Sequence, residues 1–400
     1  MQEPTQSVAV KLTGDLPAAI AVIEIQGPKV EAWLAAHWSP ASKSQQLPLN
    51  AIRYGFLATL PTASNPDSRN AIGESVVVCK TKPNSVELHC HGGMVAATTI
   101  MNSLQAFGFD VLSQSQWSMR QTQDAITAQA TLALQRAKTL KTTRILLEQQ
   151  AGALRQAFLK IESLIARRET AQAIQAIHAL ERWSSLGMHL ISPFTVILCG
   201  PPNVGKSSLL NRLLGYQRAI VHAQAGTTRD LLAEETSIGG WPVRLLDSAG
   251  IRHTEDEIEQ AGVDRAERAF AQSDLILMLV DSSQGWTEDH QAIYHRILLA
   301  KERHTTSRMQ SQCKLLYTKS DLLPLENKTH SQTRLTPPID KPEDMASVSS
   351  RTGQGIDELL HRIQLWMVPE EPNAGQGVPF HSDHVTQLEN YRQRIASIPS

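Results

Sequence analysis

An eight-residue stretch with the spacing of a phosphate-binding loop lies at residues 200–207, which read Gly-Pro-Pro-Asn-Val-Gly-Lys-Ser. It fits the pattern GxxxxGK[ST] and follows an apolar run at 194–199. Its glycines allow successive backbone N–H groups to surround a phosphate at a helix N-terminus. We expect Lys206 to reach the β- and γ-phosphate oxygens of a nucleotide and Ser207 to ligate Mg²⁺. The predicted nucleotide-binding residues of this loop are Asn203, Val204, Gly205, Lys206, Ser207 and Ser208.

Two further segments are predicted to respond to the γ-phosphate. Asp247 closes the apolar run 243–246, where its carboxylate can hold Mg²⁺ through water, and the N–H of Gly250 can contact the γ-phosphate. Between this segment and the phosphate loop lies the polar stretch Ala-Gly-Thr-Thr-Arg-Asp, residues 225–230. We expect Thr227 and Thr228 to contact the nucleotide, with the hydroxyl of Thr228 on Mg²⁺.

The choice of base is predicted to depend on Thr318-Lys-Ser-Asp321. The Asp321 carboxylate can accept two N–H bonds from guanine N1 and N2, which adenine does not offer. Lys319 would lay its alkyl stem on the base, and Ser349 and Ser350 would bring a backbone N–H to the guanine oxygen. The sequence therefore favours GTP over ATP. Because Asn is the usual first residue of this motif, we expect the shorter Thr318 to loosen the loop.

The elements that position these residues can be read from hydrophobic patterning. Apolar runs at 194–199, 243–246, 275–280 and 314–317 alternate with helix-length segments, which predicts a doubly wound α/β sheet. Two or three long helices are predicted over 119–190, and a further helical face lies at 385–395. We expect an α/β P-loop domain (192–368) inserted in a helical domain (119–191 and 380–400), preceded by a small α+β N-terminal domain (1–118).

The composition excludes several classes of protein. The 400 residues carry 38 Lys and Arg against 39 Asp and Glu, so no overall positive field gathers nucleic acid. No apolar run approaches the ~20 residues that span a bilayer, which predicts no membrane partner. The N-terminus lacks the pattern of a secretory signal, so we expect a cytoplasmic protein. The four cysteines form no CxxC pair.

The segments GPPNVGKSSLLN, AGTTRD, LLDSAGIR and TKSD together resemble a translation-factor-type GTPase, of the branch that contains Era, Der and MnmE. Three features are similar to the MnmE family of tRNA modification GTPases in particular. These are the acidic stretch 255–259 after Asp247, the segment Val-Glu-Leu-His-Cys-His-Gly-Gly at 86–93, and a GTPase domain flanked by helical segments on both sides. The resemblance covers nearly the whole chain and is strongest over about 194–366.

The resemblance implies GTP hydrolysis coupled to modification of the wobble uridine of tRNA, with the flavoprotein MnmG as partner and a homodimer formed through the N-terminal domain. It implies Glu259 as the catalytic glutamate beside Lys206, although Glu259 can also be read as a solvated residue of an acidic run. It also implies a K⁺ ion held by Asn203 and by backbone carbonyls of the loop that contains His222 and Gln224. Ile251 stands where a Ras-like enzyme has its water-positioning Gln.

The chain also departs from the MnmE pattern. The stretch 15–20 lacks the glycine and arginine of the family's loop for a formyl-tetrahydrofolate donor, so the sequence does not support folate binding. No cysteine follows Cys313, whereas the family has a C-terminal Cys-x-Gly-Lys motif, so we expect a divergent and C-terminally shortened member. Two alternatives remain open at this point. One is a degenerate paralogue that keeps a GTP switch as a regulatory module, and the other is an Era- or Der-like ribosome-assembly GTPase.

Overall fold

The computed structural model describes residues 6–14, 18–42, 47–58, 73–122, 124–216, 233–247, 267–303, 312–322, 336–339 and 341–398. The chain divides into two compact units, Met1–Leu132 and Ala133–Ser400.

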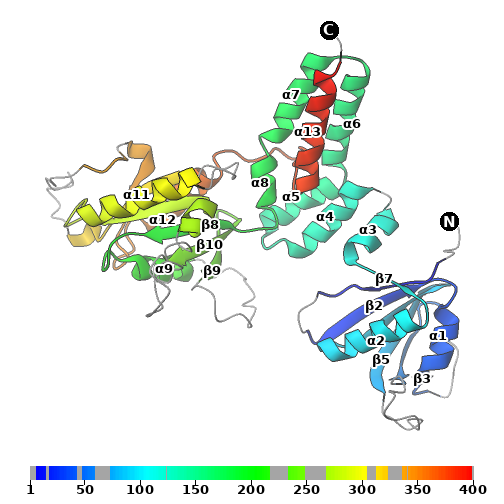
Figure 1. Ribbon diagram of the computed structural model, residues 1–400. Coiled ribbons are helices and arrows are strands. Elements are labelled where there is room, and N and C mark those ends of the chain that lie inside the picture. The colour runs from blue at the N-terminus through cyan, green and yellow to red at the C-terminus, as the bar shows by residue number, and fades with distance from the viewer. Residues whose placement is uncertain are drawn as a thin grey trace. The chain divides into compact units, whose positions relative to one another are not determined.

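The first unit is built on a seven-stranded sheet (Figure 1). In spatial order the strands are β3 (Trp38–Pro40), β4 (Ile52–Leu57), β5 (Glu74–Lys82), β6 (Ser85–His91), β2 (Ile20–Gln26), β1 (Val8–Lys11) and β7 (Asp110–Leu112). All neighbouring pairs are antiparallel except β1 and β7. Alternation along β2 buries Ala21, Ile23 and Ile25 on one face, as expected of a half-buried strand.

Helices cover the two faces of this sheet unequally. On one face α1 (Val30–His37) and α2 (Met94–Ala106) contribute Trp33 and Leu104 to the main core. On the other face, Trp117 of α3 (Gln114–Thr122) packs against Val8 and Val10 of β1. The helix α4 (Ala125–Arg136) follows. This matches the α+β character that the sequence predicts for the N-terminal region.

The second unit contains a six-stranded sheet. In spatial order the strands are β13 (Met345–Ser347), β12 (Gln312–Thr318), β11 (Leu275–Asp281), β8 (Phe194–Cys199), β10 (Trp241–Asp247) and β9 (Ala233–Ile238). All are parallel except β9, which pairs antiparallel with β10. The associated helices are α9 (Lys206–Tyr216), α11 (Glu288–Arg303) and α12 (Ile356–Met367), with short 3-10 turns η1 (Ser320–Leu322) and η2 (Pro342–Asp344). The predicted doubly wound α/β fold is confirmed.

Helices make up the rest of the second unit: α5 (Leu140–Gln150), α6 (Ala153–Ala166), α7 (Thr170–Glu181), α8 (Ser184–Met188) and α13 (Ser382–Ala396). The prediction of two or three long helices over 119–190 is wrong, because the helices there are shorter and more numerous. Some of them end at positions that are neither glycine nor proline. Thr139 caps α5 by accepting a bond from the Thr142 N–H, and Gly152 and Arg168 adopt left-handed backbone angles at φ 107° and 61°.

The helix predicted over 385–395 corresponds to α13, which packs with α6 and α7 although the sheet domain separates them in sequence (Figure 1). Its Tyr391 hydroxyl donates to Glu162 Oε1 of α6 at 2.7 Å. Burial and this hydrogen bond raise the pKa of Tyr391 well above its ordinary value, so the hydroxyl keeps its proton. Residues before and after the α/β sheet therefore form one helical layer.

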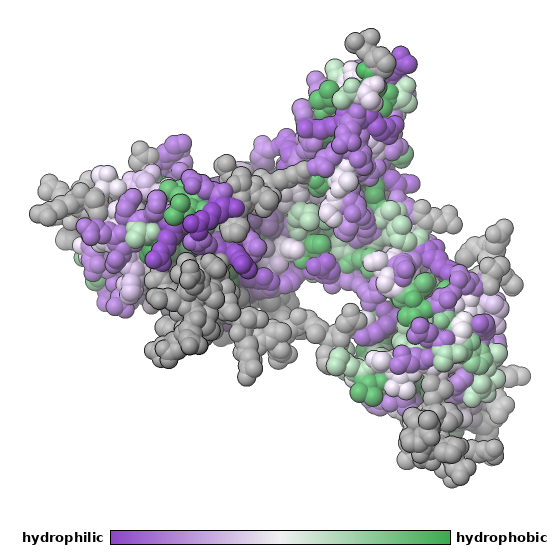
Figure 2. Space-filling model, viewed as in Figure 1, coloured by the Kyte–Doolittle hydropathy of each residue, from purple (hydrophilic) through white to green (hydrophobic). Residues whose placement is uncertain are grey.

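Hydrophilic residues cover most of the visible face of the second unit, and apolar residues appear there in small groups (Figure 2). Among the described residues, no helix combines the length and the apolar character needed to cross a membrane.

Candidate nucleotide-binding site

The phosphate loop connects the buried strand β8 to helix α9. Gly200 follows Cys199 with φ 147°, and a Cβ at this position would lie 2.7 Å from the Leu279 carbonyl oxygen of the neighbouring strand β11. Gly205 adopts φ 100° directly before α9 begins at Lys206. Only glycine fits both positions without strain. The loop therefore ends at a helix N-terminus, where backbone N–H groups are available to an anion.

Lys206 lies against this loop and is only 9% exposed. Its ammonium donates to the carbonyl oxygens of Gly200 at 3.0 Å and Pro201 at 2.8 Å. These bonds compensate for the loss of water around a buried charge. They also hold the cation at the N-terminal end of α9, where a phosphate would bind.

Ser207 and Asp247 meet at the carboxyl ends of β8 and β10. The Ser207 hydroxyl donates to Asp247 Oδ2 at 2.9 Å, and Asp247 is 7% exposed. Residues 40 positions apart in sequence are thus brought together because β10 lies parallel to β8, the strand that leads into the phosphate loop and α9. A hydroxyl and a carboxylate supply the oxygen donors that Mg²⁺ prefers, so this pair fits a Mg²⁺ site.

Thr318, at the end of β12, is 1% exposed and connects two parts of the site. Its hydroxyl lies 2.7 Å from the Val204 carbonyl oxygen in the phosphate loop and 3.2 Å from the Val280 carbonyl oxygen. We expected the shorter Thr in place of Asn to loosen this loop. The structure instead shows the Thr hydroxyl bonded to the phosphate loop, so the two loops are tied together.

Lys319 adopts a left-handed backbone with φ 56°, and its ammonium contacts Asp281 Oδ2 at 2.7 Å. Burial alone would raise the pKa of Asp281, but hydrogen bonds from Lys319 and Ser283 lower it below its ordinary value. Asp281 is therefore a carboxylate at neutral pH. It fixes the Lys319 side chain, whose stem we expect to lie on the base.

Asp321 has partners at both carboxylate oxygens. Ser349 Oγ donates to Oδ1 at 2.6 Å, and the Arg351 guanidinium contacts Oδ2 at 2.8 Å. The hydrogen bond from Ser349 lowers the pKa of Asp321, with a smaller contribution from the charge of Arg351. The Ser349–Asp321 bond joins the two base-recognition segments, and the Ser349 hydroxyl also accepts from the Thr352 N–H of its own segment at 3.2 Å.

The remaining predicted residues fall into two groups. Asn203 and Ser208 are exposed on the phosphate loop and on α9, and Ser350 is half-buried next to Ser349. Asn203 has φ 61°, a conformation that Asn tolerates better than most residues. The predicted residues that lie outside the described residues are His222, Gln224, Thr227, Thr228, Gly250 and Glu259.

Sequence reasoning missed two residues of the site, Asp281 and Arg351. Asp281 is the last residue of the fully buried strand β11, so an Asp at a strand end was the available signal. Arg351 follows Ser349 and Ser350 directly, and it lies 77% exposed beside Asp321. Among the described residues, no group of three or more His, Cys, Asp or Glu side chains is placed to hold a metal ion.

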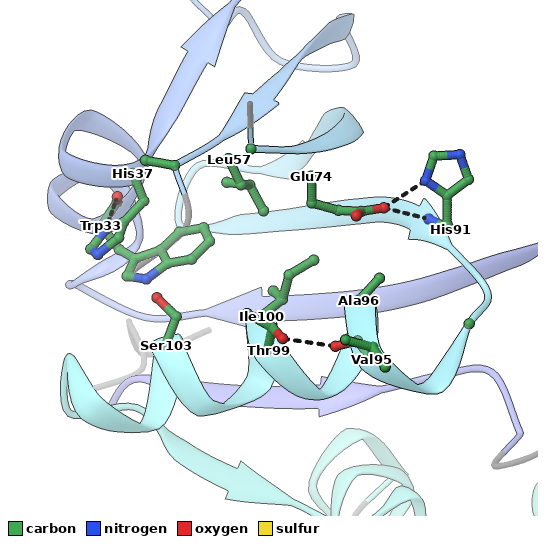
Figure 3. A pocket seen from close by; sticks show the side chains of 13 residues that line it. Trp33, His37, Leu57, Glu74, His91, Val95, Ala96, Thr99, Ile100 and Ser103 are labelled. Atoms are coloured by element: carbon green, nitrogen blue, oxygen red, sulfur yellow. Dashed lines mark hydrogen bonds and ion pairs between the residues drawn. The ribbon is translucent and has the colours of Figure 1, made fainter. Parts of the chain in front are cut away.

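A separate cavity of about 470 Å³ lies in the first unit, between α1, α2 and the ends of β4, β5 and β6 (Figure 3). Glu74 and His91 are hydrogen-bonded at 2.6 Å on one side of it, and Trp33 and His37 line the other side. Among the described residues that line the cavity, none is Lys or Arg.

Comparisons with known proteins agree with this geometry. Residues 195–310 match the family model described as "50S ribosome-binding GTPase". The fold and the site thus define a P-loop GTPase, and P-loop GTPases use Mg²⁺.

Proteins called "tRNA modification GTPase MnmE" are similar to the chain over a much longer stretch. The protein of Lactobacillus johnsonii is 32% identical, with 61% of this chain and 59% of that protein covered. The protein of Synechococcus elongatus is 29% identical over 86% and 79%. That of Staphylococcus aureus is 25% identical over 94% and 85%. Within the P-loop GTPases, the chain is thus similar to proteins of the MnmE family over most of its length. It spans 59% of the length of the first of these relatives.

Solved structures that match part of the chain include Era from Aquifex aeolicus bound to GDP and AlF4-, which is 26% identical, with a TM-score of 0.31 and coverage of 45% of this chain and 58% of that one. The G domain of the Thermotoga maritima FeoB iron transporter is 23% identical, with a TM-score of 0.29 and coverage of 44% and 99%.

Proposed function

We propose that this chain binds and hydrolyses GTP in the modification of the wobble uridine of tRNA. The observation that carries the GTP part is the arrangement around Asp321. Its carboxylate accepts a hydrogen bond from Ser349 at 2.6 Å, and the nearby Thr318 hydroxyl bonds the Val204 carbonyl of the phosphate loop. A fixed carboxylate is complementary to the two N–H groups of guanine and has no equivalent partners on adenine.

Phosphoryl transfer depends mainly on positioning and on neutralising charge, and the described residues supply both. Lys206 is held against the phosphate loop and would place its charge at the β- and γ-phosphates. Ser207 and Asp247 would hold Mg²⁺, Asp247 through water, and Mg²⁺ there supplies positive charge to the phosphate oxygens. The N–H groups at the start of α9 would contribute further hydrogen bonds to the phosphates.

Activation of the attacking water would differ from that in Ras-like enzymes, because Ile251 occupies the place of the positioning Gln. We propose that Asn203 and the carbonyls of His222 and Gln224 would hold K⁺, which would supply positive charge near the transferred phosphate, and that Glu259 would orient the water. GTP turnover should then be faster in K⁺ than in Na⁺. Glu259→Ala should slow turnover with little loss of GTP affinity. Equal turnover in both cations would remove the K⁺ proposal.

The tRNA part rests on the relatives, which carry the name tRNA modification GTPase and cover up to 94% of the chain. MnmG and tRNA are the corresponding proposed partners, in the cytoplasm. Neither the regulatory paralogue nor the Era- or Der-like GTPase is favoured by these matches. We also propose that the GTPase domain, residues 192–368, is inserted in the sequence of a helical domain made of residues 119–191 and 380–400.

We also propose a homodimer formed through the N-terminal region. Along β4, Arg53, Gly55 and Leu57 face inward, whereas Ile52, Tyr54 and Phe56 are 67%, 50% and 39% exposed on the other face. Tyr54 and Phe56 also contact each other edge to face, with centroids 5.3 Å apart. An exposed row of apolar side chains on a sheet is typical of a surface that another protein covers. A second copy of the chain is the proposed occupant, and sedimentation of a Tyr54→Ser variant tests it.

Folates carry carboxylates, which bind best to Arg or Lys. Among the described residues that line the cavity of the first unit, none is Lys or Arg, and Glu74 lies at one side. We therefore propose no folate donor for this cavity.

Complementation of a strain that lacks its own MnmE tests the tRNA proposal, with wobble uridines measured by mass spectrometry. Restored modification by the wild-type chain, and none with Lys206→Ala, is the expected result. Unmodified tRNA from a well-expressed wild-type chain that hydrolyses GTP would favour the regulatory module instead.

A further inference from the structure

The hairpin formed by β9 and β10 connects the two segments that we expect to contact the γ-phosphate. Thr227 and Thr228 precede β9, and Gly250 follows β10. The carboxyl end of β10 is Asp247, whose Oδ2 accepts the Ser207 hydroxyl in the predicted Mg²⁺ site. The opposite end of β10 begins at Trp241, six residues earlier and therefore roughly 20 Å away along the strand. The hairpin thus runs along the strand direction, from the nucleotide site to the opposite end of the strands.

That distant end of the hairpin contacts residues of the helical layer. Trp241 is fully buried, and its indole N–H donates to Glu371 Oε1 at 3.3 Å. The same Glu371 oxygen lies 2.5 Å from the Lys141 ammonium, which is also 5.5 Å from the centroid of the Trp241 ring. Lys141 belongs to the first turn of α5, and Glu371 belongs to the segment between α12 and α13. These three side chains form what we call the hairpin anchor.

A second contact reinforces the hairpin anchor. Glu235 of β9 pairs with Arg244 of β10 at 3.0 Å and with Lys138, which precedes α5. Burial alone would raise the pKa of Glu235, but hydrogen bonds from Lys138 and Arg244 lower it, so Glu235 is ionised at neutral pH. At the hairpin turn, a Cβ on Gly240 would lie 3.0 Å from Lys141 Cε. The turn is therefore closely packed on α5.

We propose that Trp241, Glu371 and Lys141 are positioning residues for the GTP site, acting through β10 on Asp247. This rests on the proposed GTP hydrolysis. Strand β10 pairs with β8 on one side and β9 on the other, so it is stiff along its length. A displacement at Trp241 is therefore carried to Asp247. Because coupling free energy is reciprocal, occupation of the γ-phosphate site must also act on the helical layer.

Neighbouring glutamates offer a matched pair of variants. Glu371 joins the hairpin to α5 through Trp241 and Lys141. Glu370 instead pairs with Arg182 at the end of α7, and no contact described for it reaches the hairpin. Glu371→Gln should lower kcat for GTP roughly three- to tenfold. Mutations of residues that connect two coupled sites change the coupling free energy by amounts of that order. GDP affinity should stay within about twofold, since no residue that binds the base or the diphosphate is altered. Glu370→Gln should match the wild type in both.

A double-mutant cycle then separates the anchor from independent structural effects. Glu371→Gln and Lys141→Met should each lower kcat, and the double variant should lose little more than either alone, because both remove one connection. Fully additive losses would show that the two residues act separately and would overturn the proposed anchor. Thermal unfolding of all variants serves as the control for general destabilisation.

Fluorine NMR of the chain labelled with 5-fluorotryptophan gives a readout that a purely structural contact would not change. Trp241→Phe identifies the Trp241 signal. We expect that signal to differ between the GDP-bound chain and the chain bound to a non-hydrolysable GTP analogue, and the difference to shrink in Glu371→Gln. An unchanged Trp241 signal, together with equal kcat for Glu371→Gln and Glu370→Gln, would overturn the inference. Absence of GTP turnover in the wild type would instead contradict the proposed function, while the NMR comparison still tests the coupling.

Discussion

The base-recognition loops and the phosphate loop lie at the same edge of one sheet, but their polar side chains are partnered differently. At the base, each partner comes from a distant part of the chain: Thr318 contacts Val204, and Asp321 contacts Ser349. At the phosphate, Lys206 contacts carbonyls only five and six residues earlier in its own loop. The base side is thus held by the tertiary fold, whereas the Lys206 cation of the phosphate side is positioned by its own loop, and only Ser207 and Val204 there have distant partners among the contacts described above.

The largest effect should come from removing the phosphate cation. Lys206→Ala should weaken GTP binding ~100-fold or more, because it deletes a charge-assisted contact to two phosphates in a partly desolvated site. Titration calorimetry with GTP and GDP measures the loss. Unchanged circular dichroism and melting temperature would show that the fold is retained. Near-normal GTP affinity would contradict the role given to this loop.

A change of base preference should come next. In Asp321→Asn the amide N–H can donate to the 2-oxo group of xanthine but repels the N2–H of guanine. We expect GTP affinity to fall roughly 50-fold, since the hydrogen bond from N2 is lost and that from N1 no longer meets a charged acceptor, and XTP affinity to rise. Competition between labelled GTP and unlabelled XTP measures both. A variant that still prefers GTP would place guanine recognition elsewhere.

The tie between the two loops should have a smaller effect. Thr318→Val removes the hydroxyl bonded to Val204 and leaves a buried carbonyl with one partner fewer, which should cost about 1 kcal/mol and lower GTP affinity about fivefold. The matched control is Thr386→Val on α13, where an exposed hydroxyl bonds the Ser382 carbonyl. Equal behaviour of the two variants in nucleotide binding would mean that the loops do not depend on this bond.

The pH dependence should be the smallest effect. Asp281 and Asp321 both have lowered pKa values, so each favours the native, ionised state. That contribution is complete above their ordinary pKa near 3.8 and is lost only as the pH falls through the lowered values. GDP affinity should therefore stay flat from about pH 8 to pH 5. A decline centred near pH 6 would show that another group controls base binding.

The same contrast explains how much the sequence could predict. The strands β8, β10, β11 and β12 were predicted because buried parallel strands read as continuous apolar runs. Strand β9 was missed because its sequence Ala-Glu-Glu-Thr-Ser-Ile has a mainly polar edge-strand composition, and only its pairing with β10 identifies it. The helix ends at Thr139 and Arg168 were missed because neither position is a glycine or proline.

The candidate site divides in the same way. The phosphate loop is a local pattern with a fixed spacing, so its residues could be named from sequence. The contact of Asp281 with Lys319 joins residues 38 positions apart, and the bonds of Thr318 to Val204 depend on which strands are neighbours. No spacing rule encodes such contacts. They follow from strand order, which the sequence indicates only as a class of fold.

The measurement that tests the account most directly is single-turnover hydrolysis of GTP and of ATP by the wild-type chain with Mg²⁺ and K⁺, with Lys206→Ala as the inactive reference. We predict that phosphate is released from GTP, that ATP is hydrolysed no faster than by the Lys206→Ala variant, and that excess GDP but not ADP suppresses the release. Equal hydrolysis of ATP and GTP, or GTP hydrolysis that survives in Lys206→Ala, would contradict a guanine-selective GTPase built on this site.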